Sequence, residues 1–242
     1  MRADDPIAAV VATAIRTGDL TALESALREH PELVNVHIEG RRGGYRTPLH
    51  LVADWPGYFP NGPAIVKALI SGGADPNGGP EGFGRQETPL HWAASSDDVD
   101  VAEALVDGGA DIEAPGGSVG TPVENAVGYG CWRVARLLVR RGARIDKLWV
   151  AAGLGMLSRM QELLRAASQE EINNAFWQAC HGGQRRAAEL LRARGADLDW
   201  VPRYAKGTPL DAAGGLDTGR EALLTWLRDQ GAKAARGDGG RE

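Results

Sequence analysis

The feature that most constrains this chain is a pair of short phrases that alternate along it. The first is Thr-Pro-Leu-His at 47–50 and 88–91, and it returns as Thr-Pro-Val-Glu at 121–124 and Thr-Pro-Leu-Asp at 208–211. The second is Gly-Ala-Asp at 73–75, 109–111 and 195–197, with the variants Gly-Ala-Arg at 142–144 and Gly-Ala at 231–232. Two phrases interleaved at a period near 33 residues indicate a repeat array.

Apolar residues recur at helical spacing between these phrases. The segments 65–70, 101–106 and 134–139 align without gaps and place apolar side chains at i, i+1, i+4 and i+5, which predicts a helix buried on one side. The segments 22–27, 160–164, 187–191 and 223–227 follow the same rule. Because Thr caps a helix start, Pro suits the first turn and Gly ends a helix, each repeat predicts two helices.

These phrases resemble the ankyrin repeat, a turn followed by two antiparallel helices. The resemblance covers residues 6–232 and implies an all-α solenoid of helix-turn-helix units, with finger loops on one edge. We expect seven units, at 6–35, 45–77, 86–113, 119–146, 147–170, 172–199 and 206–232, or six if the first or fifth is irregular. The units form one expected domain over 1–232, and the small, polar segment 233–242 is an expected flexible tail.

Composition excludes several classes of function. The net charge of −5 argues against a nucleic-acid surface, which requires a clustered basic face. No apolar run reaches about 18 residues, and no secretory signal is visible, so we expect a cytoplasmic protein without a membrane span. Cys131 and Cys180 have no metal or redox spacing, and no cofactor or metal is implied. Richness in Ala, Arg and Gly favours a bacterial source with a GC-rich genome.

One segment departs from a plain array. Between the two expected helices of the second unit lies the insert 54–63, with three prolines, two glycines and the aromatic residues Trp55, Tyr58 and Phe59. Its prolines and glycines exclude a helix, and its aromatic residues make it more apolar than an ordinary surface loop. Two interpretations remain open: the aromatic residues cover their own unit as a local cap, or they wall a pocket on the concave side.

The resemblance also implies where a partner binds, because ankyrin partners lie on the concave face against finger tips and first-helix ends. These family positions are transferred to this chain and combined with the aromatic insert. The expected partner-binding residues are then Tyr45, Arg46, Trp55, Tyr58, Phe59, Phe83, Arg85, Ser95, Ser96, Tyr129, His181, Trp200 and Tyr204. Aromatic residues and Arg are typical of binding hot spots. Trp92, Trp149 and Trp177 lie on expected first helices, as core residues or with an edge in the groove.

A catalytic alternative rests on one constellation. His181, Asp54, Glu124, Tyr129 and His91 would line a single polar cavity and perform general acid–base chemistry, although no sequence spacing supports it. In the family, the His of the opening phrase makes hydrogen bonds between repeats, which gives His50 and His91 a structural role. Glu124 and His91 are a candidate buried carboxylate–imidazole pair, in which each pKa moves toward the charged form.

Three functions are therefore compatible with the sequence. We favour a non-enzymatic scaffold that holds a protein or peptide partner, of unknown identity, in its concave groove. The alternative is a pocket for a small apolar ligand, with isomerase, cyclase or hydrolase activity, walled by the insert and the groove residues. A third is a self-associating array, which an exposed apolar end at Ile7, Val10, Val11 and Ile15 would favour.

Overall fold

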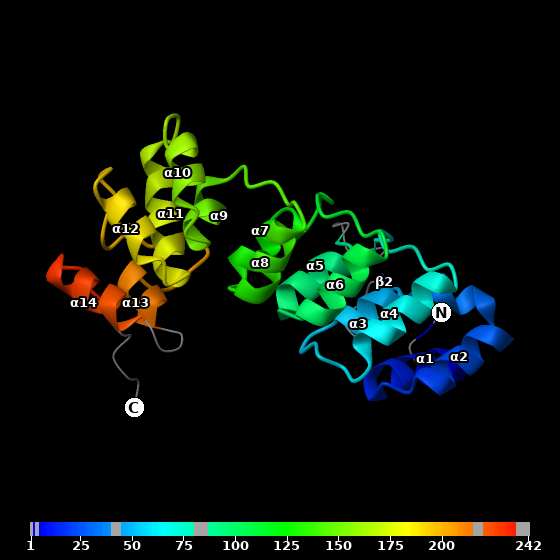
Figure 1. The fold of residues 1–242 in the computed structure, drawn as a ribbon. Coiled ribbons are helices and arrows are strands. Elements are labelled where there is room, and N and C mark those ends of the chain that lie inside the picture. The colour runs from blue at the N-terminus through cyan, green and yellow to red at the C-terminus, as the bar shows by residue number, and fades with distance from the viewer. Residues whose placement is uncertain (1, 3–4, 40–44, 80–86, 215–219, 236–242) are drawn as a thin grey trace, which may run out of the picture. The chain divides into compact units, whose positions relative to one another are not determined.

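The computed structural model describes residues 2, 5–39, 45–79, 87–214 and 220–235, and these form two compact units that divide at Arg144. The first unit, residues 1–144, contains eight of the α-helices drawn in Figure 1. They are α1 (Pro6–Thr17), α2 (Leu20–Glu29), α3 (Pro48–Ala53), α4 (Gly62–Ser71), α5 (Pro89–Ser96), α6 (Val99–Asp107), α7 (Pro122–Gly128) and α8 (Trp132–Arg140). The 3-10 helix η1 (Pro31–Asn35) and the antiparallel strands β1 (Ile38–Glu39) and β2 (Tyr45–Arg46) lie between α2 and α3.

The second compact unit, residues 145–242, contains the remaining helices of the described chain. They are α9 (Leu148–Gly153), α10 (Leu157–Leu163), α11 (Gln169–His181), α12 (Arg185–Arg192), α13 (Pro209–Gly214) and α14 (Glu221–Asp229). Every predicted second-helix segment coincides with an observed helix, from α2 to α14. The all-α fold class is confirmed.

The recurring Thr-Pro phrase builds the start of a helix as predicted. Thr47 has extended backbone, Pro48 occupies the first turn, and the Thr47 hydroxyl is placed to accept from the N–H of His50. The His50 ring closes the same cap from the other side, because its Nδ1 faces the Thr47 N–H and hydroxyl. Thr88 with His91 and Thr121 with Glu124 repeat this reciprocal cap at α5 and α7.

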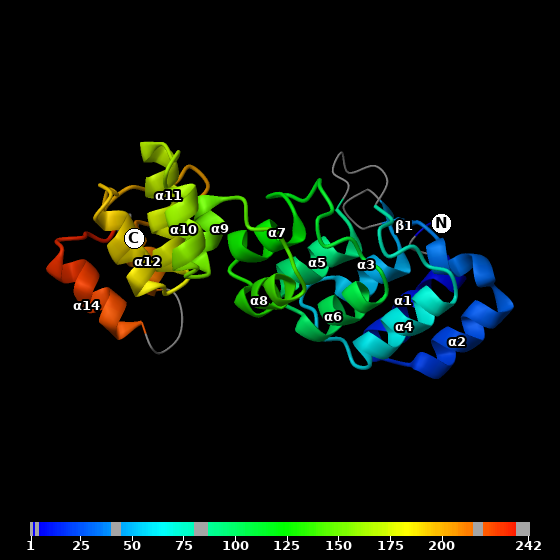
Figure 2. The same ribbon diagram turned by 45° about the horizontal axis from the view of Figure 1, so that its top comes forward.

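The helices of the first unit form two layers. The first helices α1, α3, α5 and α7 contact one another in order, and the second helices α2, α4, α6 and α8 form the other row, as Figures 1 and 2 show. The core lies between the rows, with Leu23, Leu49, Ile65, Leu90 and Leu105 essentially inaccessible to solvent. Since each helix pair shares its apolar surface with its neighbours, the stacking supplies the stability.

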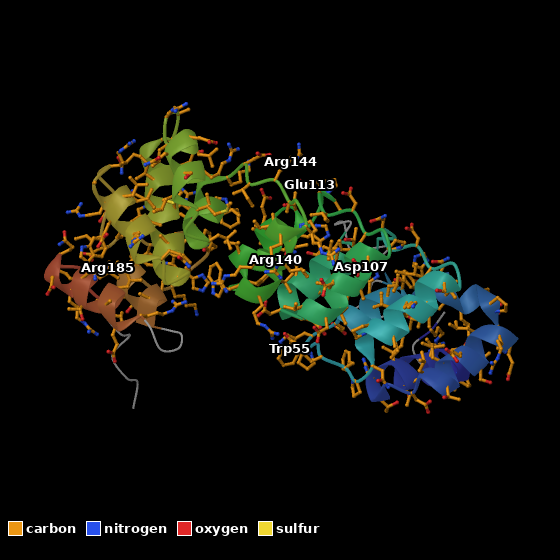
Figure 3. The ribbon with its side chains drawn as sticks, in the orientation of Figure 1. Trp55, Asp107, Glu113, Arg140, Arg144 and Arg185 are labelled. Atoms are coloured by element: carbon orange, nitrogen blue, oxygen red, sulfur yellow. The ribbon has the colours of Figure 1, made fainter. Side chains whose placement is uncertain are left out.

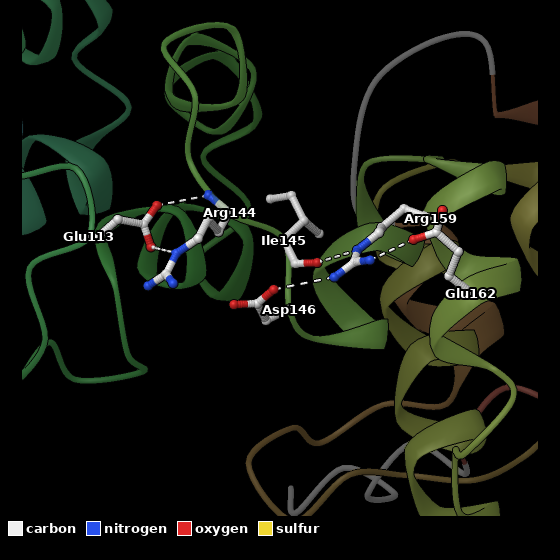
Figure 4. Close-up of polar contacts among 6 residues, drawn as sticks. All are labelled: Glu113, Arg144, Ile145, Asp146, Arg159 and Glu162. Carbon is white, nitrogen blue, oxygen red and sulfur yellow. Dashed lines mark hydrogen bonds and ion pairs between the residues drawn. The ribbon is translucent and has the colours of Figure 1, made fainter.

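Side chains at the fingers connect each helix pair to the next. Asn35 donates to the carbonyl oxygen of Gly73 and accepts from the N–H of Asp75, at 2.8 and 2.9 Å. Asn77 makes the same two bonds one repeat later, with Gly109 and Asp111. Glu113 takes the corresponding place in the following repeat and accepts from the backbone N–H and the side chain of Arg144 (Figure 4).

In the second unit, Arg159 holds the loop that precedes α9. Arg159 donates to the carbonyl oxygen of Ile145 at 2.7 Å and forms ion pairs with Asp146 and Glu162 (Figure 4). The helices α9 and α13 both contact α11, whose residue Phe176 is fully buried. The long helix α11 therefore forms the centre of this unit.

Two boundaries differ from the sequence prediction. The helix α4 begins at Gly62, inside the predicted insert, because Pro63 lies in its first turn, where no backbone N–H is required. At the other end, Lys233 and Ala235 are hydrogen bonded to Asp199 and Asp211, so the first residues of the predicted tail are held. Residues 236–242 lie outside the described part of the chain.

Candidate functional site: an aromatic cavity in the first compact unit

The insert after α3 is fixed to two later segments of the chain through Tyr58. The Tyr58 backbone N–H donates to Asp98 at 2.5 Å, and its hydroxyl donates to the carbonyl oxygen of Asp97. Arg133 of α8 donates to the Tyr58 hydroxyl at 2.7 Å, and its guanidinium lies 5.7 Å from the centre of the Tyr58 ring. Tyr58 thus contacts the two following repeats, whereas the local-cap interpretation placed the aromatic residues over their own unit.

The insert is also held from the preceding repeat. Asn61 donates to the carbonyl oxygen of Gly18 at 2.8 Å. Gly18 itself has φ of 71°, and a Cβ at this position would lie 2.4 Å from the carbonyl oxygen of Pro60. Only glycine fits at this close approach. Because both ends of the insert are fixed, its position relative to α3 and α5 is well defined.

Trp55 behaves differently from Tyr58, since 80% of its surface is exposed. Figure 3 shows its side chain projecting from the insert. Trp55 lines a cavity of about 340 Å³ together with residues of β2, of α3 and α5, and of the loops around α7. The other lining residues are Arg46, Ala53, Asp54, Glu87, Trp92, Ser95, Ser96, Ser118 and Tyr129. We call this set the aromatic cavity.

The positively charged side chain of Arg46 forms part of the cavity wall. Arg46 forms an ion pair with Asp54 at 2.8 Å, and both side chains are about 25% exposed. The Arg46 guanidinium also lies 5.1 Å from the centre of the Trp92 ring, within the range of a cation–π interaction. The Trp92 ring in turn packs against the edge of His50, with centroids 5.0 Å apart. Trp92 is therefore held between a cation and a buried ring.

His50, whose ring packs against Trp92, is uncharged. Its Nε2–H donates to the carbonyl oxygen of Glu87 at 2.9 Å, and its Nδ1 faces the Thr47 hydroxyl at 2.7 Å. A carbonyl oxygen only accepts, which fixes the proton on Nε2. Burial lowers the pKa of His50 to about 4, although the Glu87 carbonyl opposes this shift. His50 is thus neutral at pH 7.

Glu87 and Tyr129 also line the cavity. Glu87 accepts from the backbone N–H of Ser118 at 2.7 Å, and the Ser118 hydroxyl lies 3.0 Å from that of Tyr129. Tyr129 remains 54% exposed. The serines on α5 donate to carbonyl oxygens, Ser95 to that of His91 and Ser96 to those of Ala53 and Trp92. The cavity therefore combines exposed aromatic surface with polar groups that neighbouring atoms hold in place.

The structure brings together five of the expected partner-binding residues, Arg46, Trp55, Ser95, Ser96 and Tyr129. Tyr45, Tyr58 and Phe59 lie in the first unit but do not line this cavity. Phe83 and Arg85 lie outside the described residues. Glu87, Ser118 and Ala53 were missed by sequence reasoning. Glu87 immediately precedes a Thr-Pro phrase, at the end of a finger loop. This position was the sequence signal that could have identified it as a site residue.

Trp200 and Tyr204 line another cavity, in the second compact unit. The Tyr204 hydroxyl donates to Asn174 at 2.5 Å, and its ring meets that of Trp177 edge-on. Trp177 itself is buried and donates to the carbonyl oxygen of Gly207 at 2.9 Å. Trp177 therefore takes the role that His50 and His91 have in the first unit, because each donates to the residue before a Thr-Pro phrase.

The residues of the catalytic alternative have different environments. Asp54 and Tyr129 line the aromatic cavity, whereas His91 is fully buried and Glu124 accepts from the backbone N–H of Thr121. His91 contacts the carbonyl oxygen of Gly120 at 3.1 Å. Burial lowers the pKa of His91, so the expected shift toward its charged form is wrong. His181 belongs to the second compact unit, and burial lowers its pKa as well.

Comparison with known proteins identifies the class. A family model described as ankyrin repeats (3 copies) matches residues 11–116 and 49–147, which together span more than half of the chain. The chain therefore belongs to the ankyrin-repeat family. Ankyrin-repeat domains are scaffolds for protein–protein interaction.

Solved structures agree on the fold. The ankyrin repeat domain of Bcl-3, described as a unique member of the IkappaB protein family, is 24% identical with a TM-score of 0.53, over 90% of this chain and 97% of that one. The human ASB11 ankyrin repeat domain is also 24% identical with a TM-score of 0.53, over 89% and 96% of the two chains. At this identity the likeness concerns the fold alone. Among the described helices of this chain, none has the length and apolar character of a membrane span.

Proposed function

We propose that this chain is a non-enzymatic scaffold that binds a protein or peptide segment, and that the aromatic cavity holds a side chain of that partner. The observation that carries the proposal is the exposed Trp55 beside a preformed cavity. Burying an exposed tryptophan provides a large gain in free energy at little cost in side-chain entropy. The insert that presents Trp55 is already fixed by Tyr58 and Asn61, so little ordering remains to be lost on binding.

The cavity suits a side chain better than a whole small molecule. Its volume of about 340 Å³ is at the lower end of the range for ligand pockets. The catalytic alternative requires His91 and Glu124 in the same cavity, but both are engaged in the caps and contacts between repeats. Self-association through the first helix has little apolar surface to use, because Val11 and Ile15 are buried and Val10 is half exposed.

We also propose that the seven helix pairs, α1–α2 to α13–α14, are seven repeats. Within each pair the two helices contact each other, and the second helices correspond to the seven apolar segments of the sequence. The family model matches the first part of this series.

The binding proposal is tested by selecting displayed random dodecapeptides on the immobilised full chain. A selected peptide is then titrated against the wild type, Trp55→Ala and Tyr204→Ala. Because Trp55 is 80% exposed, its replacement leaves the fold intact and isolates binding. We expect Trp55→Ala to weaken affinity at least about thirtyfold, as for an interface hot spot, and Tyr204→Ala to change it less than about twofold. Affinity that depends on Tyr204 and not on Trp55 would contradict this site.

A further inference from the structure

We infer that the partner side chain held in the aromatic cavity is basic, a Lys or Arg from a positively charged segment. This inference rests on the proposed function and specifies its partner. Three of the lining residues carry charge, namely Arg46, Asp54 and Glu87. Arg46 and Asp54 neutralise each other in their ion pair, and among the described lining residues this leaves Glu87 as a charge without an ion pair.

Glu87 retains the capacity to bind a cation. One of its carboxylate oxygens, Oε1, accepts from the backbone N–H of Ser118 at 2.7 Å. Within the part of the chain that the structure describes, the second oxygen, Oε2, accepts no hydrogen bond. A carboxylate positioned by one backbone bond, with one oxygen still available, is a suitable acceptor for an ammonium or guanidinium group.

The walls of the cavity favour the same kind of group. The faces of Trp and Tyr rings attract cations, and Trp55, Trp92 and Tyr129 all line the cavity. The contact of Arg46 with Trp92 at 5.1 Å shows within this protein that a guanidinium is accepted against one of these rings. Trp55 and Tyr129 are 80% and 54% exposed and provide unoccupied aromatic surface for a second cation.

The charge of the surrounding unit supports a basic partner. Residues 1–144 contain 13 Lys and Arg against 19 Asp and Glu, a net charge of −6, whereas residues 145–242 contain 14 against 13, a net charge of +1. The acidic excess thus lies entirely in the unit that contains the cavity. Such an excess accelerates the association of basic segments and disfavours acidic ones.

The experiment continues the dodecapeptide selection with the full chain. We expect the selected peptides to share one Lys or Arg, and replacement of that residue by norleucine or citrulline to weaken binding roughly tenfold. Glu87→Gln retains an acceptor for the Ser118 N–H and removes the charge, and we expect a loss of about five- to tenfold. Glu24→Gln, an exposed carboxylate on α2, is the matched control and is expected to have no effect.

The possible results separate the inference from the proposed function. Selected peptides that depend on Trp55 but contain no basic residue, or that bind Glu87→Gln as tightly as the wild type, would overturn the inference and leave the scaffold proposal standing. Peptides that bind independently of Trp55 would overturn both. A selection that enriches no sequence would also count against both.

Discussion

At the scale of single residues, the buried histidines decide how the protein responds to acid. His50 donates through Nε2 and accepts through Nδ1. A second proton would therefore be added at Nδ1, where it would face the backbone N–H and the hydroxyl of Thr47. Its pKa is lowered by burial from 6.5 to about 4. The unfolded chain therefore binds a proton at a pH where the native chain does not. The stability that His50 contributes is fully present above pH 6.5 and is lost as the pH falls toward 4.

We expect the free energy of unfolding of the wild type to fall by on the order of 2 kcal/mol between pH 7 and pH 5 through His50 alone. Urea denaturation at several pH values measures this loss. His50→Gln is expected to be less stable at pH 7 but to have a shallower pH dependence than the wild type. Equal slopes for the wild type and His50→Gln would contradict a neutral, buried His50.

At the scale of elements, the part of the insert that precedes α4 depends on Asp98. Asp98 is 1% exposed and has two functions, because one oxygen caps α6 at the N–H of Val101 and the other accepts from the N–H of Tyr58. Removing its carboxylate takes away a helix cap and leaves the N–H of Tyr58 without its acceptor. We expect Asp98→Ala to lower the free energy of unfolding by about 2–3 kcal/mol.

Asp100 provides the control for this prediction. It lies two residues further along, in the first turn of α6, and is exposed. Its replacement by Ala removes only a favourable charge near the helix start, at a cost of about 0.5 kcal/mol. Thermal denaturation of both variants, and of Asp98→Asn, which retains one acceptor oxygen for one of the two N–H groups, distinguishes the two functions. Similar losses for Asp98→Ala and Asp100→Ala would show that the insert does not depend on Asp98.

The elements also show how far the sequence predicts the structure. The Thr-Pro phrases, the apolar spacing and the terminal Gly residues were sufficient for the positions of the helices, because these signals are local. The start of α4 was missed because Pro63 is both a helix breaker and a good first-turn residue, and sequence alone did not separate the two.

The site was harder to predict than the fold because it depends on contacts between distant repeats. Trp55 and Tyr129 were identified from their types and from the family resemblance. Glu87 and Ser118 were not, since each is an ordinary finger residue until the fold brings both to the same cavity. The lowered pKa of His91 was likewise invisible, because it follows from burial and not from the neighbouring Glu124.

At the scale of the whole molecule, the first compact unit combines the acidic charge, the family match and the aromatic cavity. All ten lining residues of the cavity lie between residues 46 and 129. The central claim is that this unit, through Trp55 and its neighbours, is where the protein binds its partner. The seven tryptophans of the chain provide a direct way to test it, because each indole N–H gives one signal in a nitrogen-correlated NMR spectrum.

The measurement is a titration of the labelled full chain with a selected peptide, with indole signals assigned by single Trp→Phe variants. We predict that the signals of Trp55 and Trp92 move together and saturate at one affinity, while those of Trp132 and Trp226, on second helices, stay in place. Saturable shifts of Trp200 with Trp55 and Trp92 unchanged, or no saturable shift of any indole, would contradict the account.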